Sequence, residues 1–153
     1  VRVWSNLGTA LERSGQYGEA SEAFDKALAL QPNSGPVQLN VGIMRMHLGK
    51  DDEAMKYFQR SLQLSLNAIE QARAHVMIGS VYGRKKMPKE AESHFRTALT
   101  IVPTDVPAHR NLVQSLLDQG RRPEAIRHLN YAVLVTNNDQ SLQQMLFEQT
   151  FGQ

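Results

Sequence analysis

The sequence predicts an all-α fold, a solenoid of four helix pairs followed by one further helix. Three observations predict it: a Glu-Ala dipeptide recurs, a large apolar residue follows each Ala by four positions, and a small residue follows three positions later. The dipeptides are Glu19-Ala20, Glu53-Ala54, Glu90-Ala91 and Glu124-Ala125, at intervals of 34, 37 and 34 residues. The large residues are Phe24, Phe58, Phe95 and Leu129, and the small ones are Ala27, Ser61, Ala98 and Ala132. Self-similarity at one such period indicates a repeat architecture.

Each repeat has the pattern of two helices. In the first repeat, apolar residues fall at helical spacing in the run from Val3 to Leu11 and again from Ala20 to Leu28. Between the halves stand residues that favour a left-handed helix end, namely Gly15, Gly49 and Gly120. A single helix pair cannot bury its apolar face, so the pairs are expected to stack on one another.

Prolines mark the helix ends that this pattern requires. Pro36 and Pro107 are placed to open first helices, and Pro88 and Pro123 to open second helices, where a first turn tolerates proline. Three extra residues, 69–71, separate the second and third repeats. We expect longer helices there, with a short turn near 67–71. Asp139 is placed to cap a last helix from Ser141 to about Thr150.

The repeat resembles the tetratricopeptide repeat. The first repeat carries the signature residues Trp4, Leu7, Gly8, Tyr17, Ala20, Phe24, Ala27 and Pro32. The resemblance implies a right-handed superhelix forming one domain, 1–153. Its repeats would span 1–34, 35–68, 72–105 and 106–139, with a terminal helix at 140–151. The second repeat departs from the family at Arg45, where a bulky apolar side chain is usual.

Composition narrows the possible functions. The chain has 153 residues and a formal net charge of +2, a balance that neither requires nor excludes an acidic partner. It has no cysteine, which excludes disulfides and cysteine-bound zinc. Its apolar runs are far shorter than a membrane span, so we predict no membrane partner. The chain begins with Val1 rather than Met, which suggests a piece of a longer protein, and its compartment is not predicted.

No motif for catalysis is recognisable, and we predict neither enzyme activity nor a cofactor. The glycines stand singly rather than in a phosphate-binding loop. Two histidine pairs, His75 with His109 and His94 with His128, lie one repeat apart. Equivalent positions in neighbouring helix pairs are about 20 Å apart, given interaxial spacings of about 8–10 Å, which is too far for one metal ion. Sequence divergence between repeats, at positions that tolerate many residue types, explains these histidines better than a metal site does.

Basic residues gather at two of the predicted turns. They are Arg84, Lys85, Lys86 and Lys89 in the third repeat, and Arg121, Arg122 and Arg127 in the fourth. Such a strip suits phosphates or an acidic segment. Solvated turn charge is the favoured interpretation, because the net charge is low and no aromatic residues are interleaved. We therefore predict no nucleic-acid partner.

The resemblance implies a concave groove lined by the first helices, and this groove is the predicted partner site. Three asparagines, Asn6, Asn40 and Asn111, share one repeat position in it, and a row of amides can hold a peptide backbone. An exposed apolar patch is expected beside them, flanked by arginines. The patch comprises Leu39, Ile43, Met46, Val76 and Met77, and the arginines are Arg73, Arg84 and Arg110. A partner with apolar anchors and acidic groups would fit this surface.

Three functional hypotheses remain open at this point. The first is a protein-interaction scaffold that binds a peptide or helix of its partner in the groove. The second is the substrate-recognition arm of a larger enzyme, such as a protein glycosyltransferase. The third is self-association through Phe147 and Phe151 of the terminal helix. The carboxylate clamp of some chaperone co-factors is disfavoured, because only Asn40 and Arg73 of its five matching positions hold suitable residues.

Overall fold

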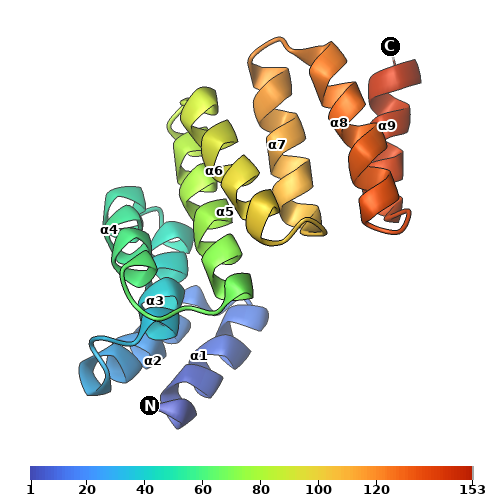
Figure 1. Ribbon diagram of the computed structural model, residues 1–153. Helices are drawn as coiled ribbons and strands as arrows, with labels where there is room; N and C mark the ends of the chain where they lie inside the picture. Colours follow the sequence, from blue (N-terminus) through green and yellow to red (C-terminus); the bar gives the residue numbers. More distant parts are fainter. Residues whose placement is uncertain (153) are drawn as a thin grey trace. The chain divides into compact units, whose positions relative to one another are not determined.

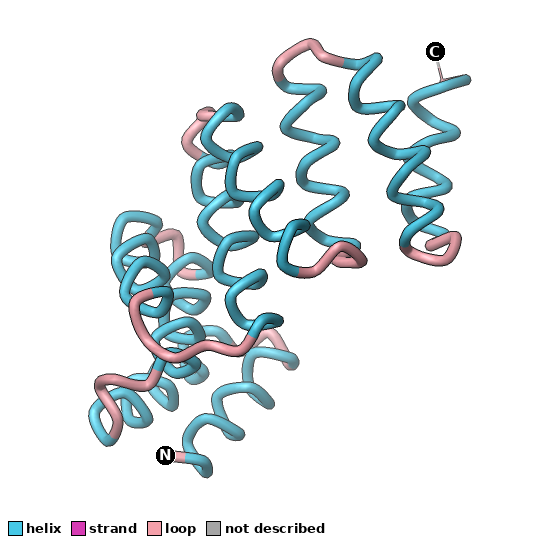
Figure 2. Tube along the Cα trace, in the orientation of Figure 1, coloured by secondary structure: helices cyan, strands magenta, loops and turns pink. Residues whose placement is uncertain are grey.

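The computed structural model describes residues 1–152, which form nine α-helices and no strand (Figures 1 and 2). The first helices of the repeats are α1 (Arg2–Arg13), α3 (Gly35–His47), α5 (Ala68–Arg84) and α7 (Val106–Asp118). The second helices are α2 (Tyr17–Leu30), α4 (Asp51–Leu62), α6 (Pro88–Ile101) and α8 (Arg122–Val135), and α9 (Gln140–Phe151) follows them. Short loops join consecutive helices, as Figure 2 shows. The predicted all-α solenoid fold is confirmed.

The helices divide into two compact units. The first unit spans Val1–Met77 and the second begins at Ile78, so α5 contributes residues to both. In the first unit α1 packs on α2, α2 on α3 and α3 on α4, and in the second α6, α7, α8 and α9 pack consecutively. The organisation of 1–153 as a single domain stays a prediction.

A phenylalanine packed against a glycine joins the two helices of a repeat. Phe24 is fully buried, and a Cβ atom built on Gly8 would lie 2.8 Å from its ring. A Cβ on Gly79 would lie 2.6 Å from the ring of Phe95. Contacts this short leave no room for a side chain. The recurring large and small residues therefore fix how closely the paired helices approach.

The turn between the second and third repeats differs from the prediction. Only α5 is long, with 17 residues, whereas α4 has 12. The break falls at residues 63–67 rather than near 67–71. Asn67 and Glu70 start α5 by capping each other: the Glu70 amide donates to Asn67 Oδ1 at 2.9 Å, and the Asn67 amide donates to Glu70 Oε2 at 3.0 Å. This reciprocal capping begins the helix before the extra residues 69–71.

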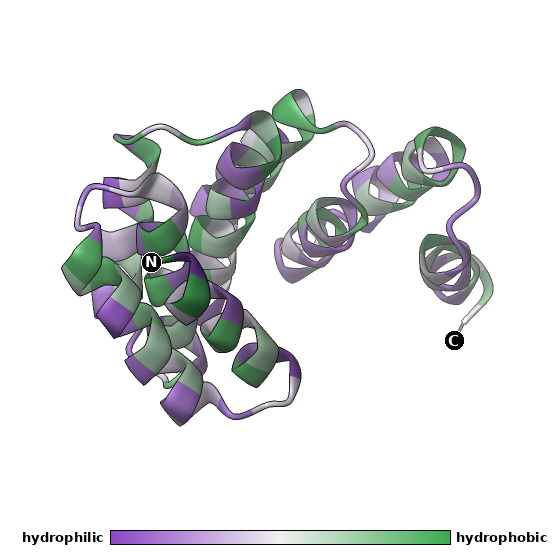
Figure 3. Ribbon diagram, turned by 90° about the horizontal axis from the view of Figure 1, so that it is seen from below, coloured by the Kyte–Doolittle hydropathy of each residue, from purple (hydrophilic) through white to green (hydrophobic). Residues whose placement is uncertain are grey.

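The helices are amphipathic. Figure 3 shows hydrophilic and hydrophobic residues alternating along the ribbons, as the packing of one face requires. Among residues 1–152, no helix combines the length and the apolar character needed to cross a bilayer. At the end of the chain, Leu142 of α9 is fully buried, whereas Phe147 and Phe151 are 60% and 70% exposed. Their aromatic rings lie 5.4 Å apart.

Candidate partner-binding clefts

A polar cleft lies in the first unit and has a volume of about 370 Å³. We call it the first cleft, and its lining comes from α1, α2, α3 and α5. The lining residues are Thr9, Glu12, Arg13, Tyr17, Asn40, His47 and Arg73. Thr9, Glu12 and Arg13 share one face of α1, because residues three and four apart are neighbours on a helix. The first cleft therefore collects side chains that are distant in sequence into one polar surface.

The side chains of the first cleft include one long ion pair, one ring stack and one amide with no partner among the described residues. Arg73 Nη2 lies 3.7 Å from Glu12 Oε1, and the Tyr17 and His47 rings stack with centroids 4.2 Å apart. The half-buried Asn40 amide forms no hydrogen bond with any residue from 1 to 152. An amide in this position can donate to one peptide group and accept from another. The first cleft thus offers hydrogen bonds and charges of both signs.

A second cleft, of about 300 Å³, lies in the second unit between α5, α6 and α7. Its walls come from first helices and its floor from the second helix α6. The wall residues are Ser80, Gly83, Arg84, Asn111, Gln114, Ser115 and Asp118, and the floor residues are Pro88, Ala91 and Phe95. Pro88, Ala91 and Phe95 are spaced by three and four positions, so they share one face of α6. Unlike the first cleft, the second cleft has an apolar base.

Most polar groups around the second cleft have partners in the protein. Gln114 Nε2 donates to Asp118 Oδ1 at 2.8 Å, and Ser115 Oγ donates to the Pro88 carbonyl at 2.5 Å. Asn111 Nδ2 approaches Ser80 Oγ only to 3.5 Å, which is a long and weak hydrogen bond. The Asn111 amide therefore has only a weak hydrogen bond to give up to an incoming ligand.

The structure brings several predicted site residues together. Asn40 and Arg73 share the first cleft, and Asn111 lines the second. Asn6 and Arg110 are exposed on α1 and α7 but line neither cleft. In both clefts most lining residues come from first-helix positions that the family resemblance assigned to the groove. Their role in binding a partner stays a prediction.

The expected exposed apolar patch is wrong. Leu39, Ile43 and Val76 are only 1%, 2% and 3% exposed. Helix α3 packs on both α2 and α4, and most of its residues are buried, so its apolar side chains belong to the core. Met46 and Met77 are half-buried. Leu39, Ile43 and Val76 therefore form no exposed apolar surface.

The prediction missed Tyr17 and the floor of the second cleft, because it considered only first helices. A signal for the floor is present in the sequence. Gly83 stands where the first repeat has Glu12, 71 residues earlier. A glycine in a wall of side chains leaves the second helix behind it accessible.

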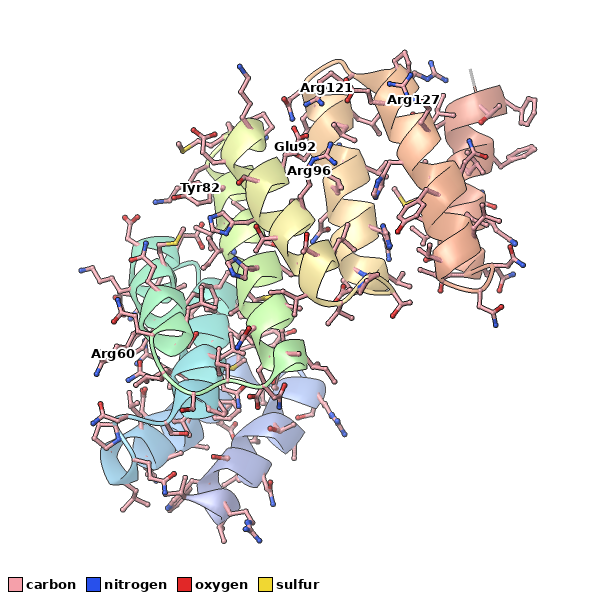
Figure 4. All side chains as sticks on the ribbon, in the orientation of Figure 1. Arg60, Tyr82, Glu92, Arg96, Arg121 and Arg127 are labelled. Carbon is pink, nitrogen blue, oxygen red and sulfur yellow. The ribbon has the colours of Figure 1, made fainter. Side chains whose placement is uncertain are left out.

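One basic cluster is used inside the second unit. Arg121 contacts Glu92 and Glu124, both at 2.6 Å, and Arg96 contacts Glu92 at 2.8 Å. Figure 4 labels Arg121, Glu92 and Arg96, which lie near one another. Burial alone would raise the pKa of Glu92, but hydrogen bonds from Gln119, Arg96 and Arg121 outweigh it and lower that pKa. Arg122 Nη2 donates to the Gln149 carbonyl at 2.6 Å. Arg121 and Arg122 thus join helices, a role that the interpretation as solvated turn charge did not include.

Two histidines of the fourth repeat, one buried and one half-buried, form a pair that the sequence did not indicate. His109 is fully buried, with Nδ1 2.9 Å from His128 Nε2 and Nε2 2.9 Å from the Pro103 carbonyl. Burial, with the nearby charges of His109 and Arg96, lowers the pKa of His128 to about 4. Burial also lowers the pKa of His109. Residues 1–152 contain no group of three or more side chains suited to a metal ion.

Comparison with solved structures supports the fold. The chain aligns with the APC/C hetero-tetramer Cut9-Hcn1 at a TM-score of 0.86 and 19% identity, covering 96% of this chain and 29% of that one. Pseudomonas aeruginosa pilF aligns with a TM-score of 0.83 and 18% identity, covering 98% of this chain and 67% of that one. The Arabidopsis OM64 TPR domain gives 0.67 and 18%, covering 74% and 92%. The chain thus spans less than a third of the Cut9-Hcn1 chain that it matches.

Sequence comparison identifies the family. A search of curated proteins finds no significant match. Three family models, each described as a tetratricopeptide repeat, match residues 1–34, 34–104 and 84–148. Together these matches extend over nearly the whole chain, including all four helix pairs. The chain therefore belongs to the tetratricopeptide repeat family.

Proposed function

We propose that this chain is a protein-interaction scaffold that binds an extended segment of a partner protein along its first helices. Repeat arrays present continuous surfaces to their partners, which suits this role. The observation that carries the proposal is the pair of equivalent clefts. Asn40 lines one and Asn111 lines the other, at the same repeat position 71 residues apart.

The amides supply recognition that is independent of the partner's side chains. A peptide bond has one donor and one acceptor, and an asparagine amide can meet both. The Asn40 amide is unused within residues 1–152, and the Asn111 amide has only a weak bond. Binding a peptide would therefore add hydrogen bonds without breaking strong ones.

The charges of the first cleft favour an acidic group in the partner. Arg13 and Arg73 line it together with one carboxylate, Glu12. The Arg73–Glu12 contact is long, and 47% of the Arg73 side chain is exposed. A partner carboxylate can approach Arg73 at modest cost, because an exposed ion pair contributes little, roughly 0–1 kcal/mol.

Selection from a phage-displayed library of short random peptides tests the proposal. Peptides selected on the native chain are then measured against Asn40→Ala and Asn111→Ala, with Asn130→Ala as the matched control. Asn130 is exposed on α8, where its amide bonds the Ile126 carbonyl at 3.0 Å, outside both clefts. We expect binding to weaken about ten-fold in either cleft variant and to persist in the control. Peptides indifferent to both cleft variants would overturn the proposal.

A further inference from the structure

We propose that the second cleft is an anchor pocket for one aliphatic or aromatic side chain of an extended partner segment. This inference rests on the proposed function and specifies the chemistry of its ligand. It places the apolar recognition on the floor that α6 provides, rather than on the buried residues of α3 and α5.

The floor favours an apolar group over a polar one. Ala91 and Phe95 are 1% and 3% exposed, and Pro88 is half-buried beside them. The Pro88 carbonyl already accepts a hydrogen bond from Ser115. An apolar side chain entering the cleft would therefore leave no floor group unsatisfied. A polar side chain there would lose water without gaining a partner on the floor.

The opening above the floor depends on Gly83. A Cβ atom at Gly83 would meet no heavy atom within 4 Å, although the residue lines the cleft. The cleft volume of about 300 Å³ is at the lower end for ligand pockets, which hold about 300–1,000 Å³. This space suits one large side chain with part of its backbone rather than a whole small molecule.

The rim selects an extended segment rather than an apolar helix. Asn111 and Gln114 on one wall can bond the peptide groups on either side of an anchor. Arg84 and Asp118 are exposed at the ends of α5 and α7 and carry opposite charges. A helix with a continuous apolar stripe would cover these charges, at a desolvation cost that a segment with polar flanks avoids.

Nuclear magnetic resonance titration with two small probes tests the pocket. The probes are N-acetyl-leucine N-methylamide, which mimics an anchor with its two peptide groups, and the matching serine compound. Saturable shifts at Ala91, Phe95 and Asn111 are expected with the leucine probe. The serine probe should bind roughly ten-fold more weakly. Equal binding of both probes, or shifts confined to other helices, would overturn the anchor pocket.

Gly83→Leu and Gly18→Leu separate blockage from damage to the fold. Both glycines lie in helices, and a Cβ atom at either meets nothing within 4 Å. Both substitutions also improve helix propensity, so both variants should fold. Gly83→Leu fills the second cleft and should abolish the leucine-probe shifts, whereas Gly18→Leu on α2 should preserve them. Unchanged probe binding in Gly83→Leu would overturn the anchor pocket.

The peptide selection distinguishes failure of this inference from failure of the proposed function. Selected peptides that need Asn40 or Asn111 but still bind Gly83→Leu would overturn the anchor pocket alone. If no selected peptide needs either asparagine, the proposed function fails and the anchor pocket fails with it. Peptides that need both asparagines and an open Gly83 site would support both.

Discussion

The two clefts are built from equivalent repeat positions and yet have different chemistry. Thr9, Glu12 and Arg13 of the first cleft correspond to Ser80, Gly83 and Arg84 of the second, each 71 residues later. The first is polar throughout, whereas the second has an apolar floor. Both contain an asparagine at one shared position. The scaffold therefore keeps the amide and varies the residue beside it.

The clefts differ at several equivalent positions, which include Glu12 and Gly83, Tyr17 and Pro88, and His47 and Asp118. Glu12 places a side chain in the first cleft and approaches Arg73, and the phenylalanine behind it, Phe24, lines no part of that cleft. Gly83 places no side chain in the second cleft, where the equivalent Phe95 lines the base and is 3% exposed. We expect the position of Glu12 and Gly83 to contribute to the difference between the clefts.

The largest expected difference in the free energy of unfolding is between substitutions of two glycines in α5. Gly79→Leu should lower the free energy of unfolding by about 3 kcal/mol, because its side chain would overlap the Phe95 ring. Gly83→Leu should leave it unchanged or raise it by up to about 0.5 kcal/mol, because the space is open and Gly83 lies in the last turn of α5, where helix propensity counts less. Urea denaturation measures both. Destabilisation by Gly83→Leu would mean that the cleft wall is already filled.

Acidification should destabilise the second unit more than the first. The pKa of His128 is 6.5 when unfolded and about 4 when folded, so its stabilising contribution is complete above pH 6.5 and is lost as the pH falls toward 4. The loss should be about 2 kcal/mol after allowing for partial exposure. His109 adds in the same direction, and Arg96, Asp105 and Tyr131 are the other ionisable groups nearby. Native-state hydrogen exchange of α8 and α4 measures the difference.

His128→Gln is the control for this acid effect. Its amide can still donate to His109 Nδ1 but takes up no proton, so α8 should lose less protection between about pH 7 and about pH 5. In the first unit, burial lowers the pKa of His75, and some acid sensitivity is expected there too. Equal acid sensitivity of α8 in the native chain and in His128→Gln would refute the role of the histidine pair.

Exchanging the key residues should exchange the chemistry of the clefts. Gly83→Glu should weaken binding of the leucine probe to the second cleft about ten-fold, equivalent to about 1.4 kcal/mol. Glu12→Gly should create weak binding of the same probe near Phe24, with less than about 1 kcal/mol of lost helix stability because Glu12 lies in the last turn of α1. Probe titrations followed by nuclear magnetic resonance report both. If both variants bound the leucine probe as the native chain does, the residue at the position of Glu12 and Gly83 would not determine whether a cleft binds an apolar side chain.

The smallest effect is expected from the ion pair in the first cleft. Glu12→Gln removes the partner of Arg73, but their 3.7 Å contact is partly solvated. The stability change should therefore stay within about 0.5 kcal/mol, as for other exposed pairs. Urea denaturation at low and at high salt measures this change in the free energy of unfolding. A loss well above 1 kcal/mol would identify the pair as a structural contact rather than an adaptable one.

The repeat pattern made the fold predictable, because the phenylalanine–glycine contacts of the first three repeats recur at intervals of 34 and 37 residues. The cleft positions of Asn40, Arg73 and Asn111 could also be predicted, because they follow from the family register. The burial of individual side chains could not be predicted from the sequence. Leu39 and Ile43 occupy groove positions by register, but whether a neighbouring helix covers them depends on packing distance.

The contacts between particular side chains could not be predicted from the sequence either. His109 and His128 meet because α7 and α8 pack together, whereas the sequence showed only that His128 matches His94 one repeat earlier. Arg45 departs from the family's apolar preference because it forms two hydrogen bonds with Asp25, at 2.8 and 2.9 Å, and also contacts Ser21. Such partners are set by the approach of helices distant in sequence, which periodicity does not encode.

Intermolecular nuclear Overhauser effects test the central claim most directly. The measurement uses the native chain and a selected peptide with one labelled apolar residue. The account predicts contacts from the labelled side chain to the Phe95 ring and the Ala91 methyl group at the base of the second cleft. Contacts to Phe147 and Phe151 on α9 instead would contradict it, and would place apolar recognition on the terminal helix.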